Sequence, residues 1–104
     1  MSSLQEIKER ADKVLCKAYS RYPVGVKEAR GSRIWDFDGR EYIDLLAGIA
    51  VTSVGHCHPE VTKAICEQMS KLVHASNLFY QEEQVLLAEK LVQTSHCKKA
   101  SNSA

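Results

Sequence analysis

The chain has 104 residues, a formal net charge of +1 at pH 7 and 44% hydrophobic residues. This length allows one domain with a modest core, and the near-neutral charge leaves no electrostatic footprint for nucleic acid or anionic membranes. No apolar run approaches the roughly 18 residues of a membrane span, and residues 1–6 lack the pattern of a signal peptide. We therefore expect a cytoplasmic protein with neither nucleic acid nor a membrane as partner.

The first predicted element is an amphipathic helix within residues 1–20. Ser3 and Glu6 have the spacing of a capping box, in which each side chain satisfies a free amide at the helix start. Apolar residues follow at helical spacing as far as Ala18. The sequence therefore predicts about four turns, ending near Tyr19.

Residues 21–47 predict an antiparallel meander of three short strands. Two turn signals, at residues 30–32 and 36–39, separate runs near 25–29, 32–36 and 40–44. The second signal contains Asp38-Gly39, a strong hairpin signal because glycine accepts the positive φ that such turns require. Trp35 and Tyr42 are predicted to pack across facing strands. We expect the acidic side chains of this region to be solvated rather than clustered: Asp36, Asp38, Glu41 and Asp44.

Residues 48–58 are predicted to form a loop, because their apolar residues lack a helical period and two glycines lie among them. A loop between two rigid elements is a common place for substrate contacts. His56, Cys57 and His58 are potential metal ligands, but adjacent residues splay apart and the usual ligand spacings are missing. The four cysteines form no Cys-x-x-Cys pair. We expect no metal site.

The rest of the chain predicts a helical part over residues 59–94 and an irregular tail over residues 95–104. Pro59 suits the first position of a helix, and the apolar pattern continues to about residue 73. A second helix is predicted over 81–94, with Glu82 and Glu83 in its first turn, where the helix dipole favours negative charge. The fold class is therefore α+β: a helix, a meander, a loop and two helices.

Several motifs occur in the order found in one enzyme family. The longest is GSRIWDFDGREYIDLLAGIAV at residues 31–51, followed by GHCHP at 55–59. YPV at 22–24, SNLFY at 76–80 and LAEKL at 87–91 complete the set. With these motifs the chain resembles the N-terminal segment of class III pyridoxal-phosphate-dependent aminotransferases, and it is most similar to their acetylornithine type.

The resemblance implies a type I fold of pyridoxal-phosphate-dependent transferases. Residues 1–104 correspond to about the first quarter of a family member, its small N-terminal subdomain, and stop before the large cofactor-binding domain. The family continues with a stretch whose backbone holds the cofactor phosphate. Asn102-Ser103 resembles the opening of that stretch, although Ala104 stands where the family has glycine.

The implied cofactor is pyridoxal phosphate, which serves as an electron sink when a lysine binds its aldehyde and an aspartate holds its ring nitrogen. In the family those groups lie outside this segment. No residue here is assigned a catalytic or cofactor-binding role, and the chain alone is expected to be inactive.

The resemblance also implies which residues line the substrate pocket. A residue at the position of Ile49 lines the substrate side, together with Ala50 and Val51, and an aromatic near Tyr19 approaches the far end of the substrate. Ornithine δ-aminotransferases resemble the chain but carry an aromatic at the Ile49 position. Asn77, Leu78 and Phe79 would face the active site of the partner subunit in a homodimer.

The implied reaction is transfer of an amino group from N-acetylornithine to 2-oxoglutarate, in arginine biosynthesis. An ornithine or 4-aminobutyrate aminotransferase segment is an alternative. An interaction module without catalysis, which binds another chain through its amphipathic helices, is a further alternative from a different class.

Overall fold

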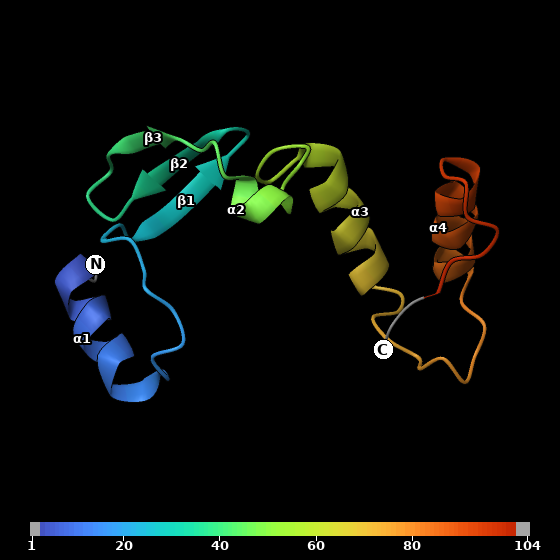
Figure 1. Cartoon of the computed structure of the whole chain (residues 1–104), viewed down its shortest axis with the longest axis horizontal. Helices are drawn as coiled ribbons and strands as arrows, with labels where there is room; N and C mark the ends of the chain where they lie inside the picture. The colour runs from blue at the N-terminus through green and yellow to red at the C-terminus, as the bar shows by residue number, and fades with distance from the viewer. Residues whose placement is uncertain (1–2, 102–104) are drawn as a thin grey trace. The chain divides into compact units, whose positions relative to one another are not determined.

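The computed structural model describes residues 3–101, so Asn102, Ser103 and Ala104, with their expected cofactor motif, lie outside the described residues. The chain divides into two units, Met1–Cys66 and Glu67–Ala104, and each is described by itself. Figure 1 labels the elements along the chain. They are α1 Leu4–Val14, β1 Val26–Arg30, β2 Arg33–Asp36, β3 Glu41–Ile43, α2 Ala47–Ala50, α3 Pro59–Met69 and α4 Glu82–Gln93. This order confirms the predicted α+β class.

The three strands form one antiparallel sheet in the order β1-β2-β3, as the turn signals predicted. The β2–β3 turn closes through a hydrogen bond from the Gly39 amide to the Asp36 carbonyl oxygen at 3.1 Å. Gly39 has a φ of 79°, which glycine adopts without the penalty that a side chain would bring. The Asp-Gly pair therefore supplies the positive φ that this hairpin turn needs.

The predicted contact between Trp35 and Tyr42 is wrong. The register pairs Tyr42 with Ile34, and Trp35 with Glu41. Neighbouring residues on a strand point to opposite faces of the sheet, so Trp35 and Tyr42 lie on opposite faces. A register one residue away from the expected one is enough to produce this difference.

Helix α1 begins as predicted but ends earlier. The Ser3 hydroxyl accepts a hydrogen bond from the Glu6 amide at 3.2 Å. The helix ends at Val14, not near Tyr19, and Leu15 is already extended with a φ of −102° and a ψ of 136°. Most helical stability comes from packing of the apolar face, and no residue of α1 is buried. Periodicity alone did not sustain the last predicted turn.

The later helices are close to their predicted ranges. Helix α4 is one residue shorter at each end than the predicted 81–94, and Gln81 is its N-cap. Helix α3 ends at Met69 rather than near residue 73. Beyond it, the amides of Lys71 and Leu72 both donate to the Gln68 carbonyl, which closes the end of the helix with a tight turn. Residues 95–101 form neither helix nor strand.

Within residues 3–101, no hydrophobic side chain is fully buried. The apolar faces of the helices are largely uncovered: Val14, Ile65 and Leu86 are 78%, 52% and 56% exposed. Among the helices of the described range, none combines the length and hydropathy that a membrane crossing requires.

Candidate functional site

Four consecutive residues after the sheet form a left-handed turn. Ala47, Gly48, Ile49 and Ala50 have φ values of 49°, 61°, 59° and 62°. The Ala50 amide donates to the Leu46 carbonyl at 3.0 Å, which closes the turn labelled α2 in Figure 1. The loop predicted over residues 48–58 therefore begins with an ordered left-handed turn. A left-handed conformation costs an L-residue roughly 1–2 kcal/mol, so three such residues need compensating contacts.

Asp44 supplies contacts at the start of this turn. Its Oδ1 atom accepts hydrogen bonds from the amides of Leu46 at 2.9 Å and Ala47 at 3.0 Å. Its Oδ2 atom lies 2.6 Å from Nε2 of His56. The bond with His56, followed by the two backbone amides, holds the pKa of Asp44 below its usual value. The expectation that Asp44 is solvated is wrong.

His56 also anchors the far end of the loop to the sheet. Its amide donates to the Gly31 carbonyl at 2.8 Å, and its carbonyl accepts from the Gly31 amide at 2.9 Å. Gly55 permits this approach, because a Cβ at its position would lie 3.0 Å from the Gly31 Cα. The loop from Asp44 to His56 is thus fixed at both ends, to itself and to the β1–β2 turn.

The turn presents apolar side chains to the outside. Ile49 is 91% exposed and Val51 is 81% exposed, and Ala50 between them is also exposed. These side chains carry no titratable group. They can form an apolar wall against an aliphatic ligand or another part of a protein, but they cannot transfer a proton.

Tyr19 is 78% exposed and lines a separate hollow of about 510 Å³ beside the end of α1. Within residues 3–101, no hydrogen bond or ion pair joins it to the turn at 47–50. Its expected role with Ile49 therefore stays a prediction.

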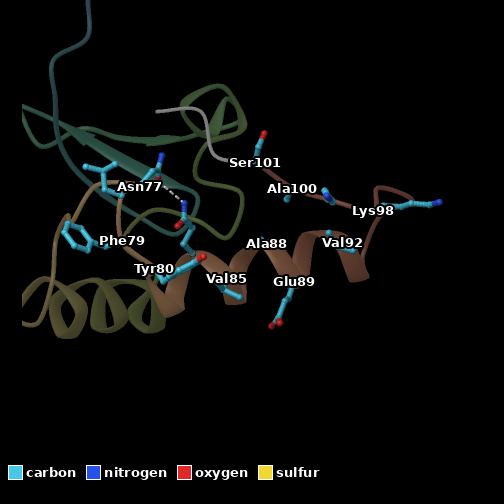
Figure 2. Close-up of a pocket in the computed structure, with 13 residues that line it drawn as sticks. Asn77, Phe79, Tyr80, Val85, Ala88, Glu89, Val92, Lys98, Ala100 and Ser101 are labelled. Atoms are coloured by element: carbon cyan, nitrogen blue, oxygen red, sulfur yellow. Dashed lines mark hydrogen bonds between the residues drawn. The ribbon is translucent and has the colours of Figure 1, made fainter.

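Asn77, Leu78 and Phe79 belong to the second unit, where they precede α4. The Asn77 side-chain oxygen accepts a hydrogen bond from Nε2 of Gln84 at 3.1 Å, which ties this segment to the helix. Figure 2 shows Asn77 and Phe79 beside the groove that runs along α4. The groove has a volume of about 820 Å³. Leu78 and Phe79 are 87% and 67% exposed, and the expected contact of this segment with a partner subunit stays a prediction.

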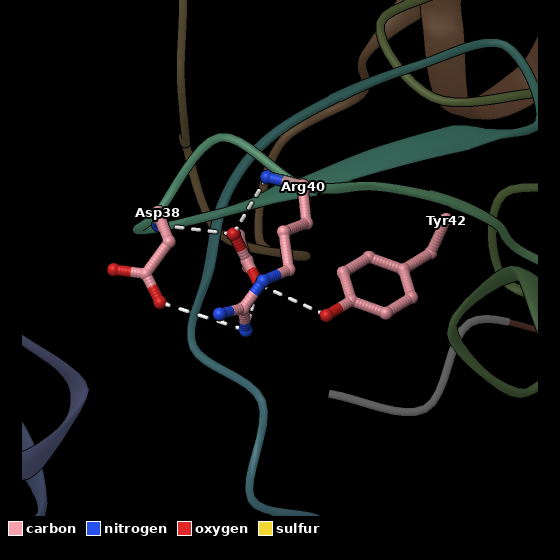
Figure 3. A network of polar contacts seen from close by, with 4 residues as sticks. Asp38, Arg40 and Tyr42 are labelled. Carbon is pink, nitrogen blue, oxygen red and sulfur yellow. Dashed lines mark hydrogen bonds and ion pairs between the residues drawn. The ribbon is translucent and has the colours of Figure 1, made fainter.

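A second polar cluster closes the β2–β3 turn (Figure 3). Asp36 is 6% exposed, and its Oδ1 atom accepts from the amides of Asp38 at 2.9 Å and Arg40 at 2.8 Å. Its Oδ2 atom accepts from the Tyr42 hydroxyl at 2.9 Å. The solvated state expected for Asp36 is therefore wrong, because turn and strand use both of its oxygens. This arrangement stabilises the hairpin and leaves the carboxylate without a free oxygen for chemistry.

Sequence reasoning missed the pairing of Asp44 with His56. Aspartate side chains commonly accept hydrogen bonds from backbone amides two or three residues later. The contacts of Asp44 with the Leu46 and Ala47 amides could therefore have been predicted from the sequence. The bond to His56 spans twelve residues and follows only from the three-dimensional course of the loop.

The described residues do not fit the phosphate anchor of pyridoxal phosphate. A phosphate binds best at a helix N-terminus with free amides and a positive dipole end. Each right-handed helix within residues 3–101 instead carries a carboxylate in its first turn, which repels an anion. No step of the chemistry is therefore assigned to a cofactor held by these residues.

Comparison with known proteins gives consistent results. Residues 15–102 match the family model described as aminotransferase class-III. An acetylornithine aminotransferase from Methanopyrus kandleri is 47% identical over 90 residues, which cover 86% of this chain and 23% of that protein. The chain thus spans about a quarter of that relative's length.

Solved structures share the same segment. The acetylornithine aminotransferase from Elizabethkingia anophelis superposes with a TM-score of 0.88 at 27% identity, covering 95% of this chain and 26% of that one. The ornithine aminotransferase from Toxoplasma gondii gives the same TM-score and identity, covering 95% and 23%. Because the family model matches most of its residues, this chain belongs to the class-III aminotransferase family.

Proposed function

We propose that the chain is the N-terminal segment of a pyridoxal-phosphate-dependent aminotransferase that uses N-acetylornithine and 2-oxoglutarate. The observation that carries this proposal is the 47% identity with an acetylornithine aminotransferase over 90 residues. By the same similarity, we infer a role in arginine biosynthesis, a cytoplasmic location and a homodimeric assembly.

In this proposal the left-handed turn forms part of the wall of the substrate pocket. Residues held in rarely populated conformations cluster at functional sites, where surrounding contacts maintain them. Ile49 is presented on such a turn and is aliphatic, which suits the aliphatic chain of a diamine derivative. Tyr19 would close the far end of the pocket. These side chains would bind and orient the substrate and exclude water.

The segment would contribute no catalytic group. The apolar side chains of the turn cannot exchange a proton, and the carboxylates of Asp36 and Asp44 are occupied by internal hydrogen bonds. Pyridoxal phosphate, when bound in a complete enzyme, supplies the electron sink for amino-group transfer. Asn77, Leu78 and Phe79 would complete the partner subunit's pocket.

Fragment complementation tests this function. The chain is co-expressed with the Methanopyrus kandleri enzyme from which the matching 90 residues have been removed. We expect the two pieces to copurify with pyridoxal phosphate and to transfer the amino group of N-acetylornithine to 2-oxoglutarate, while neither piece is active alone.

The same assay separates the alternatives. Faster turnover of ornithine or 4-aminobutyrate would change the assigned donor but keep the family role. A chain that is stable and monodisperse alone, and that never associates with the complementary piece, would overturn the proposal in favour of an interaction module.

A further inference from the structure

We propose that Asp44 and His56 are positioning residues that hold the left-handed turn at 47–50 and so place Ile49 toward the substrate. The placement of the turn is an observation, whereas its contact with substrate rests on the function proposed above. The two residues touch no substrate themselves.

The first step of the argument is the cost of the turn. Ala47, Ile49 and Ala50 are all left-handed, and Ile49 is β-branched, the residue class least tolerant of positive φ. Ile49 and Ala50 are exposed and Ala47 is half-buried, so packing within the chain covers little of the turn. Hydrogen bonds must therefore supply the compensation.

The second step is where those hydrogen bonds come from. Asp44 Oδ1 accepts from the Leu46 and Ala47 amides, which are the first donors of the turn. At the exit, the Ser53 hydroxyl donates to the Ala50 carbonyl at 2.6 Å. Among the described residues 3–101, Asp44 is the one whose side chain links the turn to a distant part of the chain, because its other oxygen meets His56.

The third step is the rigidity of the pair. The side chains of Asp44 and His56 are 11% and 21% exposed, so solvent reaches little of their bond. The His56 backbone is fixed by two hydrogen bonds to Gly31. A carboxylate with both oxygens engaged cannot rotate without losing contacts. The β1–β2 turn holds the backbones of His56 and Asp44, His56 orients the Asp44 carboxylate, and that carboxylate holds the left-handed turn.

The pair is not needed to form the sheet. The last β2–β3 register pair is Arg33 with Ile43. Beyond it the backbone amide of Asp44, not its side chain, donates to the Ser32 carbonyl at 2.8 Å, and a change of side chain keeps this bond. Loss of the pair should therefore release the turn while the hairpin persists. That separation distinguishes a positioning role from general stabilisation.

The experiment is nuclear magnetic resonance of the isotope-labelled 104-residue chain. Positive φ gives a strong intraresidue contact between the amide and α protons, which we follow at Ala47, Ile49 and Ala50. Asp44→Ala and His56→Ala should each weaken these signals and leave the Ile34–Tyr42 cross-strand contacts intact.

Two further variants make the test specific. Asp44→Asn should retain the signals, because its amide oxygen still accepts from both backbone amides and its nitrogen can donate to neutral His56. Asp38→Ala, an exposed aspartate of the neighbouring turn, is the matched control and should leave the signals unchanged.

The proposal is overturned if Asp44→Ala keeps the positive-φ signals. It is also overturned if every variant that loses them loses the β2–β3 contacts as well. In the complemented enzyme, we expect Asp44→Ala to lower kcat/KM for the donor by up to the order of 10²-fold, since misplacing a pocket wall can cost that much. An inactive complement of the unsubstituted chain would refute the proposed function, but the resonance result on the turn would stand.

Discussion

The aromatic ring of Phe37 lies directly against Gly25. A Cβ at position 25 would overlap the ring and meet the Leu4 Cδ1 atom at 3.2 Å. The Phe37 amide also donates to the Gly25 carbonyl at 3.0 Å. This contact holds the segment before β1 against the β2–β3 turn, and it leaves no room for a side chain at position 25.

Gly25→Ala should therefore weaken the contact between position 25 and Phe37, by about 1–3 kcal/mol, because added methyl groups in tight sites force neighbouring groups apart. The measurement is hydrogen exchange of the Phe37 amide, whose protection should fall. In a Phe37→Ala background the same substitution should be nearly neutral, as a double-mutant cycle would show. Equal effects in both backgrounds would contradict the assigned contact.

The hairpin should lose protection in acid because of Asp36. Burial alone would raise the pKa of this carboxyl, but hydrogen bonds from the Arg40 amide, the Tyr42 hydroxyl and the Asp38 amide outweigh it and lower the pKa below 3.8. A carboxyl whose pKa is lower in the folded state stabilises the fold at pH values above its unfolded-state pKa. This stabilisation is lost as the pH falls through the folded-state pKa.

We expect the protection factors of the Arg40 and Asp38 amides to be constant near neutral pH and to fall in acid, as the Asp36 carboxylate becomes protonated. Asp36→Asn removes the titrating group. In this variant the remaining protection of the Arg40 and Asp38 amides should not change across the acidic range. Asp38→Asn is the control, because Asp38 is exposed and should leave the acid transition in place. An identical acid transition in Asp36→Asn would refute the assignment.

Gly55→Ala should break the bridge between Gly31 and His56. Gly55 has a φ of 92°, and an added Cβ would lie 3.0 Å from the Gly31 Cα and 3.3 Å from its carbonyl oxygen. The substitution carries both a conformational and a steric penalty, which we expect to total about 2–3 kcal/mol. Exchange of the Gly31 and His56 amides reports the loss.

Gly39→Ala is the matched control for that substitution. Gly39 has a similar φ of 79°, but a Cβ there would meet nothing within 4 Å. It should show only the conformational penalty, of about 1 kcal/mol. If the two substitutions weaken their own turns equally, the close approach of the Gly31 backbone is not the reason why position 55 requires glycine.

The elements that the sequence predicted well are those specified by neighbouring residues. The strands and their Asp-Gly turn, the start of α1 at Ser3 and the range of α4 all follow from spacing, caps and turn chemistry. The errors arise where tertiary context decides. Helix α1 ends before its apolar pattern does, which shows that periodicity alone does not fix a helix end, and the Trp35–Tyr42 contact failed on a register difference of one residue.

The candidate site was predictable only in part. The resemblance indicated Ile49, and the structure adds that this residue belongs to a left-handed turn, which an aliphatic sequence such as AGIA does not suggest. The Asp44–His56 bond joins residues twelve positions apart and has no periodic signature. Such long-range polar pairs become visible only when the course of the loop is known.

Ile49 should influence which amino donor is accepted. In the complemented enzyme, Ile49→Tyr places an aromatic where the ornithine type of the family is expected to have one. We expect kcat/KM for N-acetylornithine to fall relative to ornithine by the order of tenfold, a typical effect of reshaping a hydrophobic pocket. Tyrosine is not β-branched, so it should tolerate the positive φ at this position at least as well as isoleucine.

Leu45→Tyr is the control for this change, because Leu45 is also 91% exposed but precedes the left-handed turn. It should leave the ratio of kcat/KM for N-acetylornithine to kcat/KM for ornithine unchanged. The resonance signals of the turn should confirm that both variants keep its geometry. A donor ratio that shifts equally in both variants would show that added aromatic surface, and not the wall formed by Ile49, selects the substrate. A ratio unchanged in both would place the substrate away from the turn.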